Sequence, residues 1–294
     1  MLTTTKIASP LSRKATLVSV EISQWSARKL DRKVTDEVNQ AHNASKDAGR
    51  YNKRLIAAEH LEKIQKYVSE ARTLHYTLTK PWADEGMRIL PNVLHEKFAT
   101  AFREIKRNFD QAADEFCIGY PQFIEERKRA LNGLFNESDY PSVNDIRGKF
   151  KLKHRTFPVP EADDFRSDVL DEDTVADIKR ELNETSDQVL TDAMAHTAKQ
   201  LSEVIGNMAT KLKDNDEGER QIFRDSLVEN VRELAELLPA FNFTNDPKMD
   251  SLTKRIQREL CAEDAKTLRE NKEARETVRK SADDILKDVS SLLG

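Results

Sequence analysis

The chain has 294 residues, of which 34% are charged and only 6% aromatic, and its formal net charge is −4. So small a net charge excludes a global field that would steer the whole molecule onto nucleic acid or an anionic membrane, although local patches can still do so. Glycine and proline are scarce, with eight and nine copies, which predicts few turns and therefore long helices. An apolar content of 38% argues against wholesale disorder.

Cysteine usage and hydropathy predict the compartment. Cys117 and Cys261 are far apart and lack a CxxC-type spacing, which is typical of reduced thiols in a reducing compartment. Residues 1–15 contain no continuous apolar segment of the kind that a secretory signal peptide needs. No stretch approaches the roughly 20 apolar residues that cross a bilayer. We therefore expect a cytoplasmic protein that makes no contact with the membrane.

Two segments show the alternation of a β-strand. In the first, Val18, Val20 and Ile22 alternate with polar residues. The second begins at Lys149 and ends at the prolines after Phe157. Because each strand is too short to be stable alone, we expect residues 17–24 to pair with residues 149–157.

Helical spacing of apolar residues dominates the rest of the first half. It predicts helices over 30–41 and 61–78, and a third that starts with Pro91 in its first turn and carries a heptad-like stripe. Phe98, Phe102 and Phe109 belong to this stripe and are expected in a core rather than on a recognition surface. The uncharged residues 116–121, which include Pro121, predict a turn or kink.

Ser142, with Asp145 three residues later, resembles a capping box for a short helix before the second strand. Beyond Asp168 the chain reads as purely helical. An acidic start at residues 171–173 complements the dipole of one very long helix that reaches Leu212. Further helices are predicted over 223–238, 249–260 and 263–292.

Together these elements predict a mainly α fold: an elongated bundle of long antiparallel, coiled-coil-like helices with one small two-stranded β element. We expect three segments along the chain. They are an N-terminal extension (1–15), a helical core with the β element (16–247) and a C-terminal helical segment (248–294).

Catalytic, metal and nucleotide motifs do not stand out in the sequence. It contains no HExxH, GxSxG, P-loop or GxGxxG pattern. Cys117 lies between Phe116 and Ile118, so a buried, inert thiol is favoured over an activated nucleophile. We therefore expect no enzymatic activity, no metal and no cofactor.

The second strand places four cations on one face. Lys149, Lys151, Lys153 and Arg155 recur every two residues and have the spacing to follow a phosphate backbone. Lysines on an edge strand also prevent aggregation, and this basic face lacks an aromatic stacking platform. Nucleic-acid binding here stays an alternative, as it does for the smaller basic cluster around Lys53.

The final helix offers candidate partner-binding positions. Its apolar residues are sparse and its charges are mixed in sign. An apolar stripe that the chain does not cover itself would dock a protein partner or a second copy. The candidates are Leu268, Val278, Ile285 and Val289.

Several segments, taken in order, resemble one known family, the uncharacterised DUF3150 family of tailed phages and bacterial mobile elements. The resemblance covers roughly residues 16–247. It implies no active-site residues, because the family has no established activity. Genes of the family often lie near those for a MoxR-like AAA+ ATPase and a von Willebrand A-type protein. The segments that carry the resemblance are Val18–Trp25, Lys29–Val34, Glu70–Tyr76, Leu78–Trp82, Arg88–Pro91, Ala130–Leu131 through Tyr140–Pro141, Phe157–Pro160 and Phe223–Asn230.

We therefore expect a non-enzymatic interaction protein of a phage or mobile genetic element, an adaptor or scaffold that works with the ATPase or its companion or that self-associates. The alternative is a nucleic-acid-binding accessory factor that uses the basic strand at residues 149–155.

Overall fold

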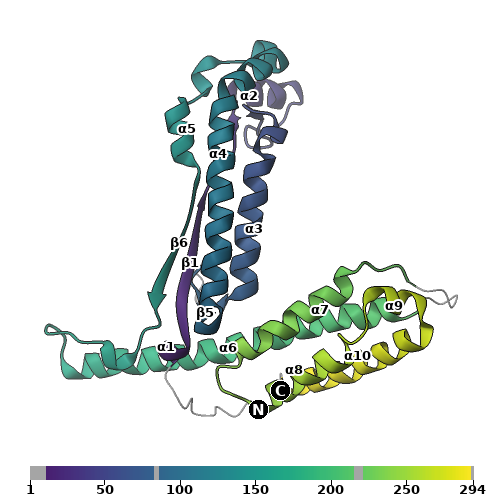
Figure 1. Ribbon diagram of the computed structural model, residues 1–294. Coiled ribbons are helices and arrows are strands. Elements are labelled where there is room, and N and C mark those ends of the chain that lie inside the picture. Colours follow the sequence, from purple (N-terminus) through teal and green to yellow (C-terminus); the bar gives the residue numbers. More distant parts are fainter. Residues whose placement is uncertain (1–10, 83–85, 215–220, 293–294) are drawn as a thin grey trace. The chain divides into compact units, whose positions relative to one another are not determined.

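The computed structural model describes residues 11–82, 86–214 and 221–292, and the chain is mainly helical, as predicted (Figure 1). The chain divides into two compact units. Unit 1 comprises Met1–Val18, Leu78–His95 and Thr156–Gly294, and unit 2 comprises Ser19–Thr77 and Glu96–Arg155.

Unit 2 is built on α3 (Glu62–Leu78) and α4 (His95–Leu131), which lie side by side in Figure 1. The phenylalanine stripe of α4 is buried as expected, with Phe98, Phe102 and Phe109 each no more than 1% exposed. Burial of this much aromatic surface stabilises the unit more than the intrinsic helix propensity of α4 does.

The predicted pairing of the two distant strands is confirmed, but inside a larger sheet. β1 (Ala15–Ser23) neighbours β6 (Lys151–Pro158), and the four-stranded order is β4-β5-β1-β6. The additional strands are β4 (Lys80–Pro81) and β5 (Arg88–Pro91). β5 runs antiparallel to β1, so that Ala15 lies opposite Pro91. Pro91 therefore ends a strand, and the prediction that it opens a helix is wrong.

Helix α4 continues through residues 116–121, so the turn predicted there is wrong. Pro121 lies inside the helix, although a proline cannot donate the backbone hydrogen bond expected there. The aromatic residues around it explain why the helix persists. The Tyr120 ring lies 5.8 Å from the Trp25 ring, and the Phe116 ring lies 5.5 Å from the Phe150 ring. This packing compensates for the missing hydrogen bond.

Shorter elements complete unit 2. Ser142 caps α5, because its hydroxyl accepts a hydrogen bond of 3.2 Å from the amide of Asp145, as the capping-box pattern predicts. Lys149 is the last residue of α5, so the basic strand begins two residues later than expected. The other elements are β2 (Arg28–Leu30), which pairs antiparallel with β3 (Asn52–Arg54), α2 (Arg32–Ala41), α5 (Val143–Lys149) and the 3-10 helices η1 (Ala58–Leu61), η3 (Asn132–Leu134) and η4 (Glu137–Asp139).

Unit 1 is organised around α6 (Glu172–Leu212), the long helix that the sequence predicts. Asp171 caps its first turn by accepting a hydrogen bond of 2.8 Å from the amide of Thr174. The predicted final helix is two helices, because Asn271 separates α9 from α10. The remaining elements are α1 (Leu11–Lys14), η2 (Asn92–Leu94), η5 (Ala162–Asp164), α7 (Ser226–Leu237), η6 (Leu238–Phe241), α8 (Pro247–Glu259), α9 (Ala265–Glu270) and α10 (Lys272–Leu292).

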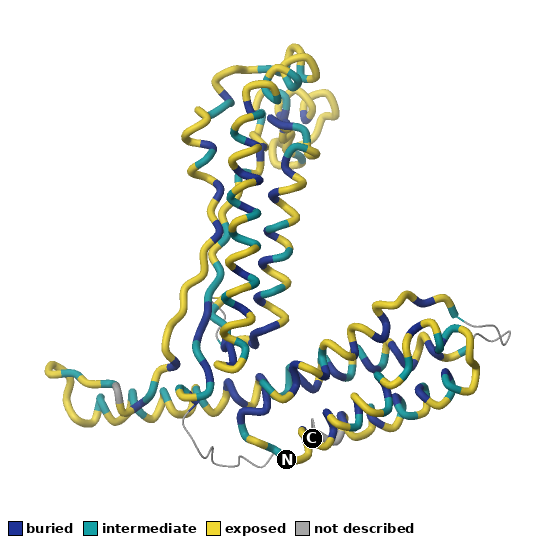
Figure 2. Tube along the Cα trace, in the orientation of Figure 1, coloured by how far each residue is buried: buried dark blue, intermediate teal, exposed yellow. Residues whose placement is uncertain are grey.

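One hydrophobic core joins α6, α7, α8, α9 and α10, and Figure 2 shows buried positions recurring along these helices. Ile205, Ile256 and Ile285 from three of them are all fully buried. The C-terminal segment from residue 248 onward therefore shares its core with α6 and α7 instead of forming a body of its own. Residues 1–10 of the expected N-terminal extension lie outside the described residues, and α1 begins at Leu11.

Among the described helices, none combines the length and the apolar composition that a transmembrane span requires.

Candidate interaction surface

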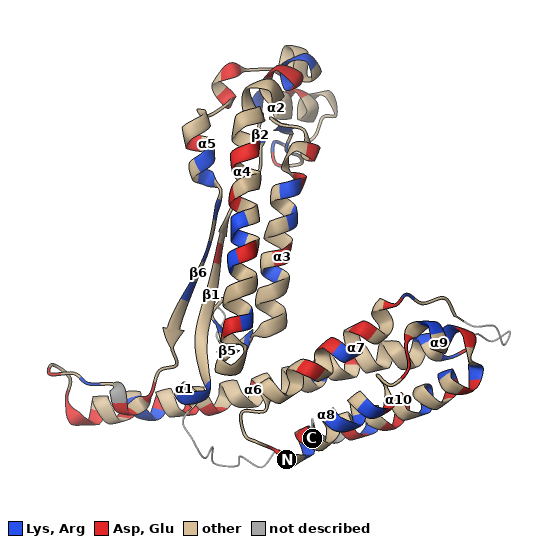
Figure 3. Cartoon of the chain, viewed as in Figure 1, with Lys and Arg blue, Asp and Glu red and all other residues tan. Residues whose placement is uncertain are grey.

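Strand β6 presents the predicted basic face. Leu152 points inward and is 1% exposed, and the ring of His154 meets the ring of Phe102 edge-on at 4.6 Å. Because side chains alternate along a strand, Lys151, Lys153 and Arg155 fall on the opposite face, and all three are exposed. Figure 3 shows these cations in blue along β6. The predicted alternation is confirmed for these three residues.

The four predicted cations are not equivalent. The Arg155 guanidinium lies 2.9 Å from a Glu21 carboxylate oxygen, so its charge is already matched within the chain. Lys149 is exposed at the end of α5. Within the described part of the chain, neither Lys149, Lys151 nor Lys153 forms an ion pair. Three ammonium groups remain available for an external anion.

The backbone of β6 is a second feature of this surface. β6 is the last strand in the order of its sheet, and Leu152 is its single buried residue. An edge strand leaves every second peptide group without a ladder partner on its outer side. The basic face therefore lies beside a row of unpaired amide and carbonyl groups.

A second surface runs along the exposed side of α4. It forms an open hollow of about 690 Å³, with cations at its N-terminal end and carboxylates further along. The last residue along this side, Ile118, is apolar and 82% exposed. The residues that line the hollow are Arg103, Lys106, Arg107, Asp110, Gln111, Asp114, Glu115 and Ile118.

Ion pairs from the neighbouring helices hold the acidic end of this hollow in place. Arg147 of α5 lies 2.5 Å from Asp114 and 3.5 Å from Asp110. Lys63 of α3 lies 2.7 Å from Glu115, which lowers the pKa of Glu115 and raises that of Lys63. Such exposed pairs contribute little stability, but they fix which charge stands where.

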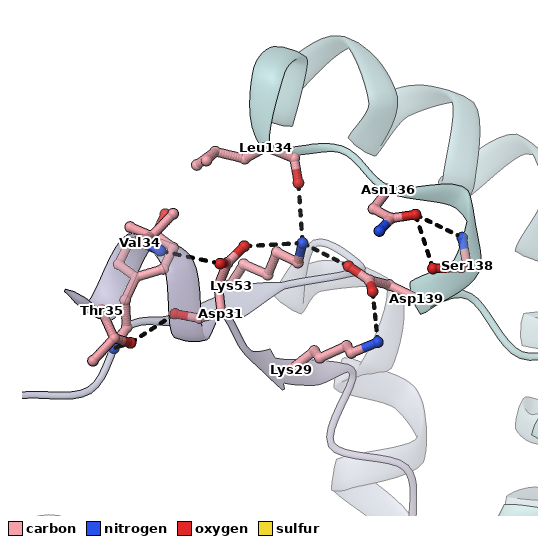
Figure 4. A network of polar contacts seen from close by, with 10 residues as sticks. Lys29, Asp31, Val34, Thr35, Lys53, Leu134, Asn136, Ser138 and Asp139 are labelled. Carbon is pink, nitrogen blue, oxygen red and sulfur yellow. Dashed lines mark hydrogen bonds and ion pairs between the residues drawn. The ribbon is translucent and has the colours of Figure 1, made fainter. Parts of the chain in front are cut away.

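A buried polar network lies where α2, β3 and η4 meet (Figure 4). The ammonium of Lys53, whose side chain is 7% exposed, lies 3.1 Å from Asp31 and 2.6 Å from Asp139. It also donates a hydrogen bond of 3.1 Å to the carbonyl of Leu134. Lys29 reaches Asp139 from the other side at 2.6 Å.

The charges of this network balance, with two ammonium groups facing two carboxylates. Burial lowers the pKa of Lys53, but the hydrogen bonds with Asp139 and Asp31 outweigh burial, so the pKa of Lys53 is raised. For Asp139, burial raises the pKa, whereas the hydrogen bonds from Lys29 and Lys53 lower it. The hydrogen bonds have the larger effect, so the pKa of Asp139 is lowered. A buried network whose charges balance favours a structural role. Lys53 itself is therefore not free to bind an external anion.

Unit 1 contains a buried lysine that the sequence patterns did not reveal. Lys80 of β4 is 1% exposed, donates to the side-chain oxygen of Gln200 on α6, and lies 4.4 Å from the centre of the Phe241 ring. Burial, with the nearby charge of Arg88, lowers the pKa of Lys80 to about 8. A two-residue strand that ends in a proline carries no periodicity that would mark this side chain as buried.

His196 stands one turn before Gln200 on the same helix. Its Nδ1 atom is buried and makes no hydrogen bond to any residue that the structure describes. Burial and the positive charges of Lys80 and Arg88 lower the pKa of His196. Both Lys80 and His196 therefore hold a proton less tightly than the same side chains do in water.

The predicted partner-binding residues of the C-terminal segment are part of the core of unit 1. Leu268, Ile285 and Val289 are fully buried, and Val278 is 4% exposed. We expected the chain to leave this stripe uncovered. Instead, the four residues belong to a core that also contains residues of α6, α7 and α8. We do not base a docking site on these residues.

The two cysteines are free and partly buried, and burial raises the pKa of both Cys117 and Cys261. A raised thiol pKa favours the inert protonated form. No group of three or more histidine, cysteine, aspartate or glutamate side chains is placed to hold a metal ion in the described ranges.

The chain matches the family model of DUF3150, a protein of unknown function, over residues 13–265. It therefore belongs to this family, and the family region extends beyond residue 247 to the start of α9. No curated protein and no solved structure matches the chain.

Proposed function

We propose that this protein is a non-enzymatic adaptor or scaffold of a bacteriophage or another mobile genetic element. In the cytoplasm of the bacterial host it would work with a MoxR-type AAA+ ATPase and a von Willebrand A-type partner. The partners are taken from the genes that accompany the DUF3150 family, to which the chain belongs.

The observation that carries the proposal is the ordered charge pattern on the exposed side of α4. From Arg103 to Ile118 this face spans roughly 22 Å at the rise of an α-helix. Its cations precede its carboxylates, and an exposed isoleucine lies at the end. At its N-terminal end, a partner helix with carboxylates opposite Arg103 and Arg107 would complement it, whereas its own carboxylates are already paired with Arg147 and Lys63. Such complementarity supplies orientation and a fast association rate more than raw affinity.

The test is binding between the purified chain and the ATPase and von Willebrand A-type proteins encoded beside it, measured by biolayer interferometry. We expect saturable binding that Arg103→Glu plus Arg107→Glu weakens by at least about tenfold. The matched control, Arg32→Glu plus Lys33→Glu, makes the same charge change on exposed positions of α2. Absence of binding to both proteins at low salt contradicts the proposal.

The three available lysines support a second candidate, a nucleic-acid-binding accessory factor that uses Lys149, Lys151 and Lys153 with Arg155 at the end of the row. Fluorescence anisotropy with single-stranded DNA at low salt tests it. Binding should fall steeply with added salt, because each phosphate contact releases counterions. Binding that survives Lys151→Glu plus Lys153→Glu would reject this candidate.

A further inference from the structure

We infer that the outer edge of β6 docks an extended acidic segment of a partner protein by strand addition. The inference rests on the proposed function, because it gives the adaptor a second docking site with a different occupant. It concerns the part of β6 that lies in unit 2, from Lys151 to Arg155.

The backbone of this strand supplies the docking groups. β6 ends the strand order, so the amide and carbonyl groups on its outer side face no other strand of the sheet. An extended segment that lies along this side would pair with them in a ladder. Recognition through the backbone fixes the occupant as extended polypeptide, whatever its exact sequence.

The strand is held in the conformation that docking requires. On its inner face, Leu152 is buried and the ring of His154 packs edge-on against Phe102. At its start, the hydroxyl of Ser23 donates a hydrogen bond of 2.9 Å to the carbonyl of Lys149. At the other end of this stretch, Arg155 is paired with Glu21. Little ordering of β6 would be needed on binding, which preserves affinity.

The side chains select the charge of the occupant. Lys151 and Lys153 stand on the exposed face, two residues apart, and neither has an anionic partner in the described ranges. Pairing with β6 of a second copy would bring lysines opposite lysines, which is destabilising. Carboxylates at every second position of an incoming strand would lie opposite these lysines, each pair contributing roughly 0.2–1 kcal/mol. The same charges thus reject self-association and favour an acidic strand.

Single-stranded nucleic acid is the competing occupant of this face. Its phosphates would use the same lysines. Nucleic acid offers no peptide groups in the register of a strand, however, so the edge of β6 would stay unpaired. The edge and the charge together therefore favour a peptide.

The experiment compares three fluorescein-labelled probes by anisotropy at low salt. The first is a peptide of about ten residues in which glutamate and valine alternate. The second replaces each valine by proline, which keeps the carboxylates and an extended chain but removes ladder donors. The third is an oligothymidylate of similar length. We expect the glutamate–valine peptide to bind, and the proline peptide to bind at least about tenfold more weakly.

Two double variants of the full chain sharpen the test. Lys151→Glu plus Lys153→Glu should weaken binding of the glutamate–valine peptide by at least about tenfold. Lys33→Glu plus Lys66→Glu makes the same charge change at exposed positions of α2 and α3 and should leave binding within about twofold. Hydrogen exchange should show slower amide exchange in residues 151–155 when the peptide is bound. Unchanged thermal unfolding of each variant shows that it is folded.

Three results would overturn the inference. Equal binding of the proline peptide would reduce the site to charge alone, and binding of the oligothymidylate without the glutamate–valine peptide would make it a nucleic-acid site. Self-association that is lost with the lysine variants would make the occupant a second copy. A chain that binds its ATPase through α4 but not the peptide fails only this inference, and the reverse result fails only the proposed function.

Discussion

Lys53 Nζ lies 2.6 Å from Asp139 Oδ2, and this ion pair joins β3 to η4, elements that are far apart in sequence. Both side chains are nearly buried, so each ion relies on the other for the solvation that it has lost. The pair is therefore a fixed feature of unit 2, whereas Arg103 and Arg107 of α4 and Lys151 and Lys153 of β6 are exposed and carry no ion pair within the described ranges.

Replacing Asp139 by asparagine keeps the shape of the side chain and removes its charge. We expect a loss of about 1–3 kcal/mol in the free energy of unfolding, because Lys53 stays buried with Asp31 as its one remaining carboxylate. Urea unfolding at neutral pH measures it. The control, Lys33→Met, removes an exposed pair with Glu37 and should cost less than about 0.5 kcal/mol. Equal effects of the two substitutions would show that the network is not structural.

The same network predicts a dependence on pH. The amide of Val34 and the ammonium of Lys53 hold the pKa of Asp31 below its ordinary value of 3.8, and the hydrogen bonds from Lys29 and Lys53 hold that of Asp139 below 3.8 despite burial. Because the folded pKa values are the lower ones, the unfolded chain binds more protons at acidic pH. This stabilisation is complete above pH 3.8 and is lost as the pH falls through the folded values.

Urea unfolding over the acidic range should therefore show stability falling more gently in Asp139→Asn than in the original chain. The curves should be parallel at neutral pH, where both aspartates are ionised in either state. Identical slopes in the two chains below pH 3.8 would contradict the assigned role of Asp139.

Lys80 gives a prediction of the opposite sign. Its pKa of about 8 when folded lies below the ordinary value of 10.5, so the unfolded chain binds the extra proton between these values. The cost of burying the ammonium is fully present below pH 8 and disappears as the pH rises to 10.5. Lys80→Met should therefore stabilise unit 1 at neutral pH by about 1–2 kcal/mol, since one pKa unit corresponds to about 1.4 kcal/mol and the lost contact with Gln200 offsets part of the gain.

Thermal unfolding of this variant at neutral and at alkaline pH provides the measurement, with the difference from the original chain cancelling the titration of other lysines. The advantage of methionine should shrink as the pH rises above 8. A variant that is destabilised equally at both pH values would show that the ammonium is well solvated by its neighbours.

Local patterns predicted the elements that depend on neighbours in sequence, and failed where distant residues decide. The cap at Ser142 and the phenylalanine stripe of α4 are visible as spacing alone. Strands β4 and β5 have two and four residues, which is too short for alternation to be read. Lys53 and Lys80 look like surface lysines until the fold brings Asp139 and Gln200 to them.

The stripe of α10 shows the same limit for function. A helix that packs on its own chain and one that docks a partner carry the same apolar spacing. The spacing therefore does not distinguish burial against the chain's own helices from burial against a partner protein. Ile285→Ala decides the question. Ile285 is fully buried, so we expect a loss of about 2–4 kcal/mol in urea unfolding. Lys287→Ala, on the exposed side of the same helix, should change stability by less than about 0.5 kcal/mol. A small effect of Ile285→Ala would return the stripe to the candidate docking sites.

The uninterrupted course of α4 through Pro121 leads to the last prediction. Proline inside a helix removes one backbone hydrogen bond and crowds the carbonyl of the residue four positions earlier, here Cys117. Since the aromatic packing of Phe116 and Tyr120 already holds the helix, Pro121→Ala should restore the bond without moving its neighbours and raise the free energy of unfolding by about 1–3 kcal/mol.

Gly206→Ala provides the calibration for this experiment. Gly206 lies inside α6 with open space around its Cα, so alanine should contribute about 1 kcal/mol through helix propensity alone. Urea unfolding of both variants separates the restored hydrogen bond from propensity, because only Pro121→Ala adds a donor. A loss of stability in Pro121→Ala would mean that the proline ring itself is part of the packing around Trp25, and that α4 depends on the residue that should have broken it.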